Sequence, residues 1–344
     1  MLRALGWFVV GTLSVLLALE LVLQVLPTST ATRTGYYIDP NILTYPPGHV
    51  FQTSFGWSLE RPQQHRANNF GFLAEHDFVP DPRATALIGD SYVEASMLPM
   101  SKRLAAQLEL RQNGRPVYAM AGPGSSLLDY AERVRFAAEN LGTRDFVIVI
   151  ERGDVMQSIC GSGNVHAVCL DAASLAPKIE RISGDDRLLT DVLRKSALAQ
   201  YLFSQLRLNL QDMKSRAKQL YVRPNALPAA PVPSSDGARR IDAVIRSFFE
   251  RLEPYRDSSF TLVLGSDLIA LSVDSASAPD LARVRLLEVA RAWGANVVDT
   301  ELLFRARMER SALALGVAPR DGHWNPLAMR LVADAVPSGG SPKR

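Results

Sequence analysis

A glycine, an acid and a hydroxyl stand together where an apolar run ends, in the stretch TALIGDSYVEASML of residues 85–98. Because Gly89 lacks a Cβ, it allows the tight turn that this pattern predicts between a buried strand at 84–88 and a helix opening at 93–98. Such a turn exposes Ser91 at the end of a sheet, near the N–H groups of a helix start, which suits a nucleophile. Asp90 and Ser91 are also preferred helix N-caps, so this motif alone leaves both interpretations open.

A serine nucleophile needs a base to remove its proton and an acid to orient that base. His323 lies in a predicted loop just before the last helix, two residues after Asp321. Residues at i and i+2 of a loop can point at one site, so Asp321 would hold the imidazole while His323 Nε2 faces Ser91. The alternative is that Asp321 caps the helix and His323 is a surface residue. The remaining histidines lie in other segments: His49, His65, His76 and His166.

The elements that must position these residues alternate between strands and helices. Strands are predicted at 84–88, 116–122, 145–151, 260–265 and 295–299, and helices at 102–112, 127–142, 241–252, 280–293 and 327–336. This alternation predicts a parallel three-layer α/β domain over residues 81–337. Ligands of such sheets gather beyond the carboxyl ends of the strands, which is where Ser91 would stand.

Three stretches depart from that alternation. Residues 28–80 are rich in proline, aromatic residues and asparagine and are expected to form an irregular lead-in. Residues 155–240 are expected to form a helical insertion whose last part, 222–240, is a proline-rich mobile loop. Residues 338–344 are expected to be a disordered tail.

Two cysteines, Cys160 and Cys169, flank the segment GSGNVHAV. An even count with close spacing fits a small loop disulfide in an oxidising compartment, and two unrelated buried thiols are the alternative. Together with His166 the cysteines lack a familiar zinc-ligand spacing, so we expect no metal and no cofactor.

The N-terminal segment is far more apolar than the rest of the chain. Residues 4–26 carry one charge, Glu20, and would span about 34 Å as a helix, which exceeds a bilayer core. Because this run is long for a cleaved signal, residues 1–27 are expected to be an uncleaved anchor; a buried core helix is the alternative. Glu20 and Gln24 share one helix face, either near the far interface or towards a partner helix. Arg3 lies before the helix, which favours a cytoplasmic N-terminus and a periplasmic body at the inner membrane.

The composition of the 344 residues restricts the classes of function. Apolar residues make up 47% and charged residues 21%, so a packed core is expected and global disorder is not. The net charge of +3 is spread along the chain, with no basic block with interleaved aromatic residues, so nucleic acid is not an expected partner.

Three blocks of the chain resemble the SGNH, or GDSL-type, serine hydrolases. They are GDS after the first strand, a glycine after the second strand, and DGHWNP before the terminal helix. The resemblance covers residues 84–336 except 155–240, and the apolar N-terminus and the segment NNFGF resemble membrane-anchored bacterial members. It implies a flavodoxin-like fold with a parallel central sheet, and ester chemistry.

The resemblance also implies roles for individual residues. Ser91 would be the nucleophile, His323 the general base and Asp321 its orienting acid. The N–H groups of Gly122 and Ser91 would hold the oxyanion, while Gly89 and Asp90 complete the GDS block as supporting residues.

The third block departs from the family pattern. The family has an asparagine after the third strand, where this chain reads ERGD and places Gly153. Losing one oxyanion donor costs about 10²–10³ in rate, so this departure predicts a weaker or absent activity. Asn164 in the following loop is a candidate replacement, and Arg152 is a candidate for added positive charge. The Asp-x-His spacing also differs from the more usual Asp-x-x-His.

The leading hypothesis is therefore an anchored serine esterase that hydrolyses O-acyl esters of cell-envelope or exported carbohydrate. It becomes an O-acyltransferase if a sugar hydroxyl replaces water. The rivals are a weak or inactive relative that binds glycan or supports a membrane assembly, and a scaffold whose anchor and insertion are the working parts. Trp324, beside the expected base, is either a core residue or a platform for a sugar ring.

Overall fold

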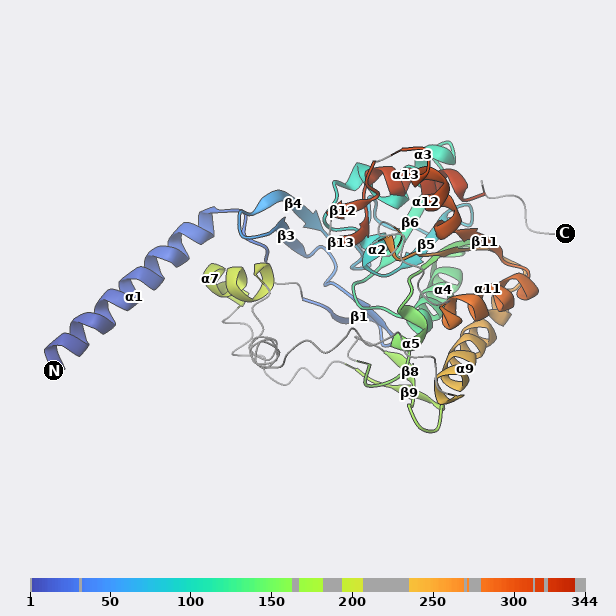
Figure 1. Ribbon diagram of the computed structural model, residues 1–344, viewed down its shortest axis with the longest axis horizontal. Helices are drawn as coiled ribbons and strands as arrows, with labels where there is room; N and C mark the ends of the chain where they lie inside the picture. Colours follow the sequence, from blue (N-terminus) through green and yellow to red (C-terminus); the bar gives the residue numbers. More distant parts are fainter. Residues whose placement is uncertain are drawn as a thin grey trace. The chain divides into compact units, whose positions relative to one another are not determined.

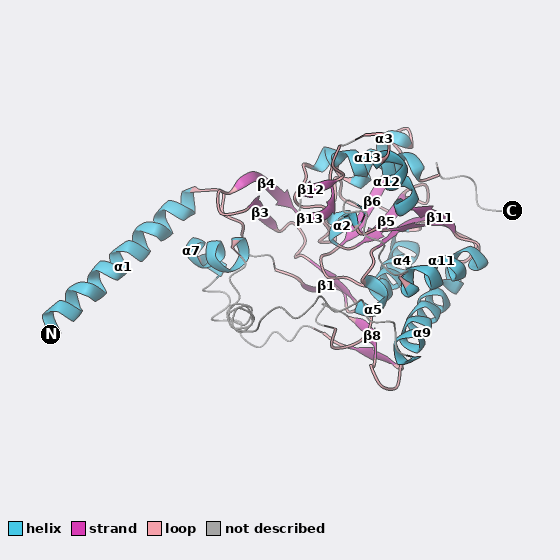
Figure 2. Ribbon diagram, in the orientation of Figure 1, coloured by secondary structure: helices cyan, strands magenta, loops and turns pink. Residues whose placement is uncertain are grey.

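Five parallel strands form the central sheet in the computed structural model (Figure 1, Figure 2). Their order across the sheet is β11-β10-β7-β5-β6. The strands are β5 (Thr85–Gly89), β6 (Val117–Ala121), β7 (Asp145–Ile150), β10 (Ser259–Leu264) and β11 (Asn296–Asp299). All neighbouring pairs are parallel, and β5, β6 and the middle of β7 are buried, which explains their near-continuous apolar sequences. The order is flavodoxin-like, so the expected α/β fold class is confirmed.

The structure describes residues 2–30, 33–162, 167–181, 194–206, 235–268, 271, 280–311, 313–318 and 321–337. They belong to two compact units. The first comprises 1–33, 50–66 and 183–229, and the second comprises 34–49, 67–182 and 230–344. The lead-in expected at 28–80 is therefore divided between the two units.

Helices cover both faces of the sheet in the second unit (Figure 1). One layer holds α3 (Leu104–Arg111), α12 (Thr300–Met308) and α13 (Pro326–Ala335), and the other holds α4 (Leu127–Leu141), α9 (Ser235–Leu252) and α11 (Leu281–Trp293). Gly142 and Gly294 follow α4 and α11 with φ of 70° and 93°, so glycine ends both helices in the left-handed conformation. Helix α9 begins at Ser235, so the last six residues of the expected proline-rich loop are helical instead.

Short elements complete the second unit. The helices are α2 (Ser91–Glu94), η1 (Met100–Lys102), α5 (Asp154–Gln157) and η3 (Glu253–Tyr255). The two-stranded sheets pair β1 (Gly35–Asp39) with β2 (Ile42–Thr44), β8 (Val168–Leu170) with β9 (Pro177–Ile179), and β12 (Gly316–Ala318) with β13 (Asp321–Trp324).

Three expectations about local structure were wrong. The lead-in is not irregular throughout, because β1 pairs with β2 in it. The segment at 321–324 is a strand rather than a loop, because it pairs with β12. Helix α2 ends at Glu94 instead of continuing to Leu98, because Ala95 adopts a left-handed φ of 42°.

The first unit contains α1 (Leu2–Val25), the antiparallel strands β3 (Val50–Phe55) and β4 (Glu60–Arg66), α7 (Ala197–Gln200) and a π-helix (Tyr201–Gln205). Residues Arg3–Val25 of α1 have a mean hydropathy of 2.2 over their best window and are long enough to cross a membrane. An N-terminal signal sequence has the same properties. Residues 194–206 are the part of the expected helical insertion that is described in this unit, and the tail at 338–344 lies outside the described residues.

Candidate active site

Two side chains that lie far apart in the sequence of the second unit meet beside the central sheet. The Oγ atom of Ser91 lies 2.9 Å from Nε2 of His323, a hydrogen-bond distance. Ser91 is two residues beyond β5, and His323 is the third residue of β13. This places the contact at the carboxyl end of the central strands, beside the β5–β7 pair where the strand order reverses.

The turn after β5 presents Ser91, and Gly89 and Asp90 have separate roles in forming it. A Cβ at Gly89 would lie 2.5 Å from Val93 Cγ2, so this close turn requires glycine. The carboxylate of Asp90 accepts the Tyr92 N–H at 2.9 Å and caps α2. The N-cap role predicted for either residue therefore belongs to Asp90, and the Ser91 hydroxyl contacts His323 instead.

Aromatic packing holds the imidazole of His323. Its ring stacks on Tyr92 with centroids 4.6 Å apart, and Tyr92 in turn meets Trp324 edge-on at 5.4 Å. Trp324 is 0% exposed and packs against Phe304, so it is a core residue and cannot offer a face to a sugar ring. Tyr92 belongs to the same short helix as Ser91, which couples the position of the imidazole to that of the serine.

The predicted orienting acid is described only in its backbone. Asp321 pairs with Ala318 in the β12–β13 ladder, and its side chain lies outside the described residues. The alternative that Asp321 caps the last helix is wrong, because Asn325 caps α13 by accepting the N–H groups of Leu327 and Ala328. Asn164, the candidate replacement donor, also lies outside the described residues.

A buried arginine links the loops that follow β5 and β6. Arg133 of α4 is 1% exposed, and its Nη1 donates to the carbonyl of Gly89 at 2.7 Å. Its Nη2 donates to Ser125 Oγ, which itself donates to the carbonyl of Gly122 at 2.8 Å. The turn that carries Ser91 and the predicted oxyanion glycine are thus tied to one cation. Sequence reasoning missed Arg133, since one basic residue in an amphipathic helix carries no local signal of burial.

The segment that follows β7 contains Gly153, where the family pattern has an asparagine. Gly153 precedes α5, and a Cβ there would lie 2.5 Å from Gln157 Nε2, so the Gln157 amide occupies the space beside Gly153. Arg152, the candidate for added positive charge, forms ion pairs with Asp267 and Asp280 at 3.2 and 3.1 Å.

Three carboxyl groups gather near the ends of β5 and β7. Burial raises the pKa values of Asp90, Glu151 and Asp154, and the charge of Asp90 raises the latter two further. Asp154 accepts hydrogen bonds from Tyr130 Oη at 2.8 Å and from the Glu151 N–H at 2.7 Å. The hydrogen bond from the Tyr92 N–H and the positive charge of Arg133 act in the opposite direction on Asp90, and so favour its carboxylate form.

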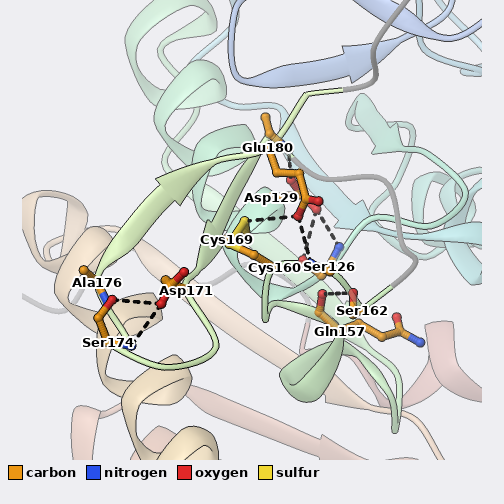
Figure 3. The surroundings of a disulfide bond; sticks show 12 residues. Ser126, Asp129, Gln157, Cys160, Ser162, Cys169, Asp171, Ser174, Ala176 and Glu180 are labelled. Atoms are coloured by element: carbon orange, nitrogen blue, oxygen red, sulfur yellow. Dashed lines mark hydrogen bonds between the residues drawn. A yellow bond between two sulfur atoms is a disulfide. The ribbon is translucent and has the colours of Figure 1, made fainter.

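A disulfide braces the neighbouring loop (Figure 3). Cys160 and Cys169 are bonded, with their Cα atoms 5.2 Å apart. Beside them, Asp129 accepts the Ser126 N–H at the start of α4 at 2.8 Å and the Ala167 N–H of the disulfide loop at 3.3 Å. The loop is therefore fixed to the helix that carries Arg133.

Glu94, at the end of α2, leads to a prediction about pH. It is buried, accepts a 3.0 Å hydrogen bond from Tyr45 Oη, and also faces the charges of Arg103, Arg133 and Asp90. Burial raises the pKa of Glu94 to about 7 from 4.5. The folded state therefore binds the proton more tightly, and this stabilisation, about 3 kcal/mol, is present below pH 4.5 and is lost as pH rises to 7.

We therefore expect the free energy of unfolding of Glu94→Gln to decrease less between pH 5 and 8 than that of the wild type, because glutamine mimics the protonated acid. Urea denaturation of the full chain in detergent at several pH values measures this. The exposed Glu288→Gln is the matched control and should follow the wild type. An unchanged pH slope in Glu94→Gln would contradict the raised pKa.

Comparisons with known proteins concern the fold. No family model and no curated protein matches the sequence. An α/β hydrolase from the metagenome of Lake Arreo, Spain, has a TM-score of 0.41 and 15% identity, covering 75% of this chain and 94% of that one. A lipolytic protein of the G-D-S-L family from Veillonella parvula has a TM-score of 0.39 and 11% identity, covering 73% and 94%. An acetyl xylan esterase from Butyrivibrio proteoclasticus has a TM-score of 0.33 and 9% identity, covering 80% and 65%. At these values the comparisons assign no activity to this chain.

Proposed function

We propose that this chain is a serine hydrolase of O-acyl esters, anchored in a membrane by α1. The observation that carries the proposal is the 2.9 Å contact between Ser91 Oγ and His323 Nε2. A hydroxyl at the end of a parallel strand, in hydrogen-bond reach of an imidazole, is the arrangement that nucleophilic acyl transfer requires.

The reaction follows from these positions. His323 Nε2 takes the proton of Ser91 as Oγ attacks the ester carbonyl, and the N–H groups of Ser91 and Gly122 are proposed to stabilise the oxyanion. His323 then protonates the leaving alkoxide, and an acyl-enzyme remains on Ser91. Water attacks this ester in the second half and releases the acid. Asp321 is proposed to orient the imidazole, and a sugar hydroxyl in place of water would make the reaction an acyl transfer.

The proposed substrate is O-acylated carbohydrate on the periplasmic side of the inner membrane. Support comes from the resemblance to anchored members of the SGNH group and from the apolar length of α1. A second candidate function, a glycan-binding relative without activity, is favoured by Gly153, where no side-chain amide of that residue can assist the oxyanion.

A fluorophosphonate probe tests the proposal, because it reacts with activated serines. We expect the full chain in detergent to be labelled, and Ser91→Ala and His323→Ala to lose the label. Ser174→Ala, an exposed serine in the same unit, is the matched control and should retain it. Acetate release from an acetylated saccharide then tests the substrate class. A folded wild type that takes no label would favour the glycan-binding function.

A further inference from the structure

Glu20, the single acidic residue of α1, is hydrogen-bonded to another segment of the same unit. The carboxylate of Glu20 accepts the N–H groups of Ala197 and Leu198 at 2.8 and 2.9 Å, and the hydroxyl of Ser196 at 2.7 Å. Figure 1 shows α7 beside the C-terminal part of α1. Glu20 therefore satisfies the first N–H groups of α7, which otherwise lack partners within that helix.

A second set of contacts ties the β3–β4 hairpin to the same place. Gln205, at the end of the π-helix, donates to the carbonyl of Gly56 at 2.7 Å and accepts the Ser29 N–H at 3.2 Å. Tyr201 Oη donates to the carbonyl of Trp57 at 2.8 Å. The hairpin turn, the α7 segment and the end of α1 thus form one hydrogen-bonded assembly, which we call the collar (residues 26–30, 50–66 and 194–206).

The collar exposes large aromatic side chains. Trp57 is 77% exposed and Phe203 is 52% exposed, and both belong to the segments fixed to the end of α1. Tryptophan and other large amphipathic or apolar rings favour the headgroup layer of a bilayer. Glu20 lies five residues before the end of α1, about 7.5 Å along its axis, so the collar begins at the depth of the membrane interface if α1 spans the bilayer.

The charge of the collar also favours contact with a lipid surface. Its described residues include the basic side chains of Arg61, Arg66, Arg194 and Lys195 but only one acidic side chain, that of Glu60. Basic residues beside a spanning helix are attracted to anionic lipid headgroups. Exposed rings together with an excess of positive charge match a lipid surface rather than bulk water.

We propose that the collar binds the membrane surface, with Trp57 and Phe203 inserted into the headgroup layer beside α1. This rests on the anchoring part of the proposed function. The collar would attach the chain to the membrane surface in addition to α1. The hydrogen bonds of Glu20 would hold the collar against the spanning helix.

Quenching of tryptophan fluorescence by brominated lipids tests the collar. The full chain is reconstituted into phosphatidylcholine vesicles brominated near the headgroup or deep in the acyl chain. Trp7 of α1 reports insertion of the helix. In a Trp7→Phe chain, we expect residual quenching that is stronger with the shallow bromines and is lost in Trp7→Phe/Trp57→Phe. Trp293→Phe, which removes a tryptophan of α11, is the control and should leave lipid quenching unchanged.

The two parts of the proposal fail separately. If Trp7 is not quenched by either lipid, the anchoring itself is wrong. If Trp7 is quenched but Trp57 is not, α1 inserts and the collar proposal is overturned. A far-ultraviolet circular dichroism spectrum equal to that of the wild type shows that each variant is folded, so absent quenching reports position rather than misfolding.

Discussion

Replacing Ser91 and His323 together is expected to reduce ester hydrolysis no further than replacing either residue alone. Each single alanine variant should lower kcat by about 10³–10⁶-fold, because the hydroxyl is a poor nucleophile without its base and the base has no proton to take without the hydroxyl. Because Ser91 and His323 are proposed to act as one unit through their 2.9 Å contact, we expect the effects of replacing them not to be additive.

Rates of p-nitrophenyl acetate hydrolysis by the two single variants and the double variant measure this coupling. The matched control is Ser174→Ala combined with His76→Ala, which removes an exposed serine that bonds to Asp171 and an exposed histidine that pairs with Glu109. Ser174→Ala, His76→Ala and the double variant that combines them should all retain wild-type kcat. Losses that multiply in the Ser91/His323 double variant would show that the two side chains act independently, and would overturn the proposed mechanism.

The sheet and the serine–histidine pair were accessible from the sequence because both leave local signals. Strand β7 is a continuous apolar run, α4 ends at a glycine, and Gly89 before Asp90 and Ser91 marks a tight turn. Alternation of such elements dictates a parallel sheet, and its carboxyl edge then brings the residues after β5 towards one crevice.

Contacts between residues far apart in the chain left no such signal. Glu20 was visible as an isolated charge, but its contacts with α7 join residues about 176 positions apart in the chain. The choice of Asp90 rather than Ser91 as N-cap was undecidable locally, because both types cap helices equally well. Tertiary contacts decide these cases, so neither propensity nor periodicity could.

Arg133 is the clearest example, and its removal carries the second large prediction. Burial lowers the pKa of this guanidinium, and the nearby carboxylates of Asp129, Asp90 and Glu94 act in the opposite direction. In Arg133→Met the carbonyl of Gly89 and the hydroxyl of Ser125 lose their donor, and the buried acids lose a countercharge. We expect the free energy of unfolding to fall by about 3–5 kcal/mol, since an uncompensated buried charge is left behind.

Arg135, two residues further along α4, provides the matched control. It makes ion pairs with Asp39, Glu132 and Glu139, yet its side chain is 32% exposed. If burial rather than the number of ion pairs determines the loss, Arg135→Met should cost about 1 kcal/mol or less. Urea denaturation of both variants in detergent compares them directly. Equal losses, or a larger loss for Arg135→Met, would mean that the burial of Arg133 does not determine its contribution to stability.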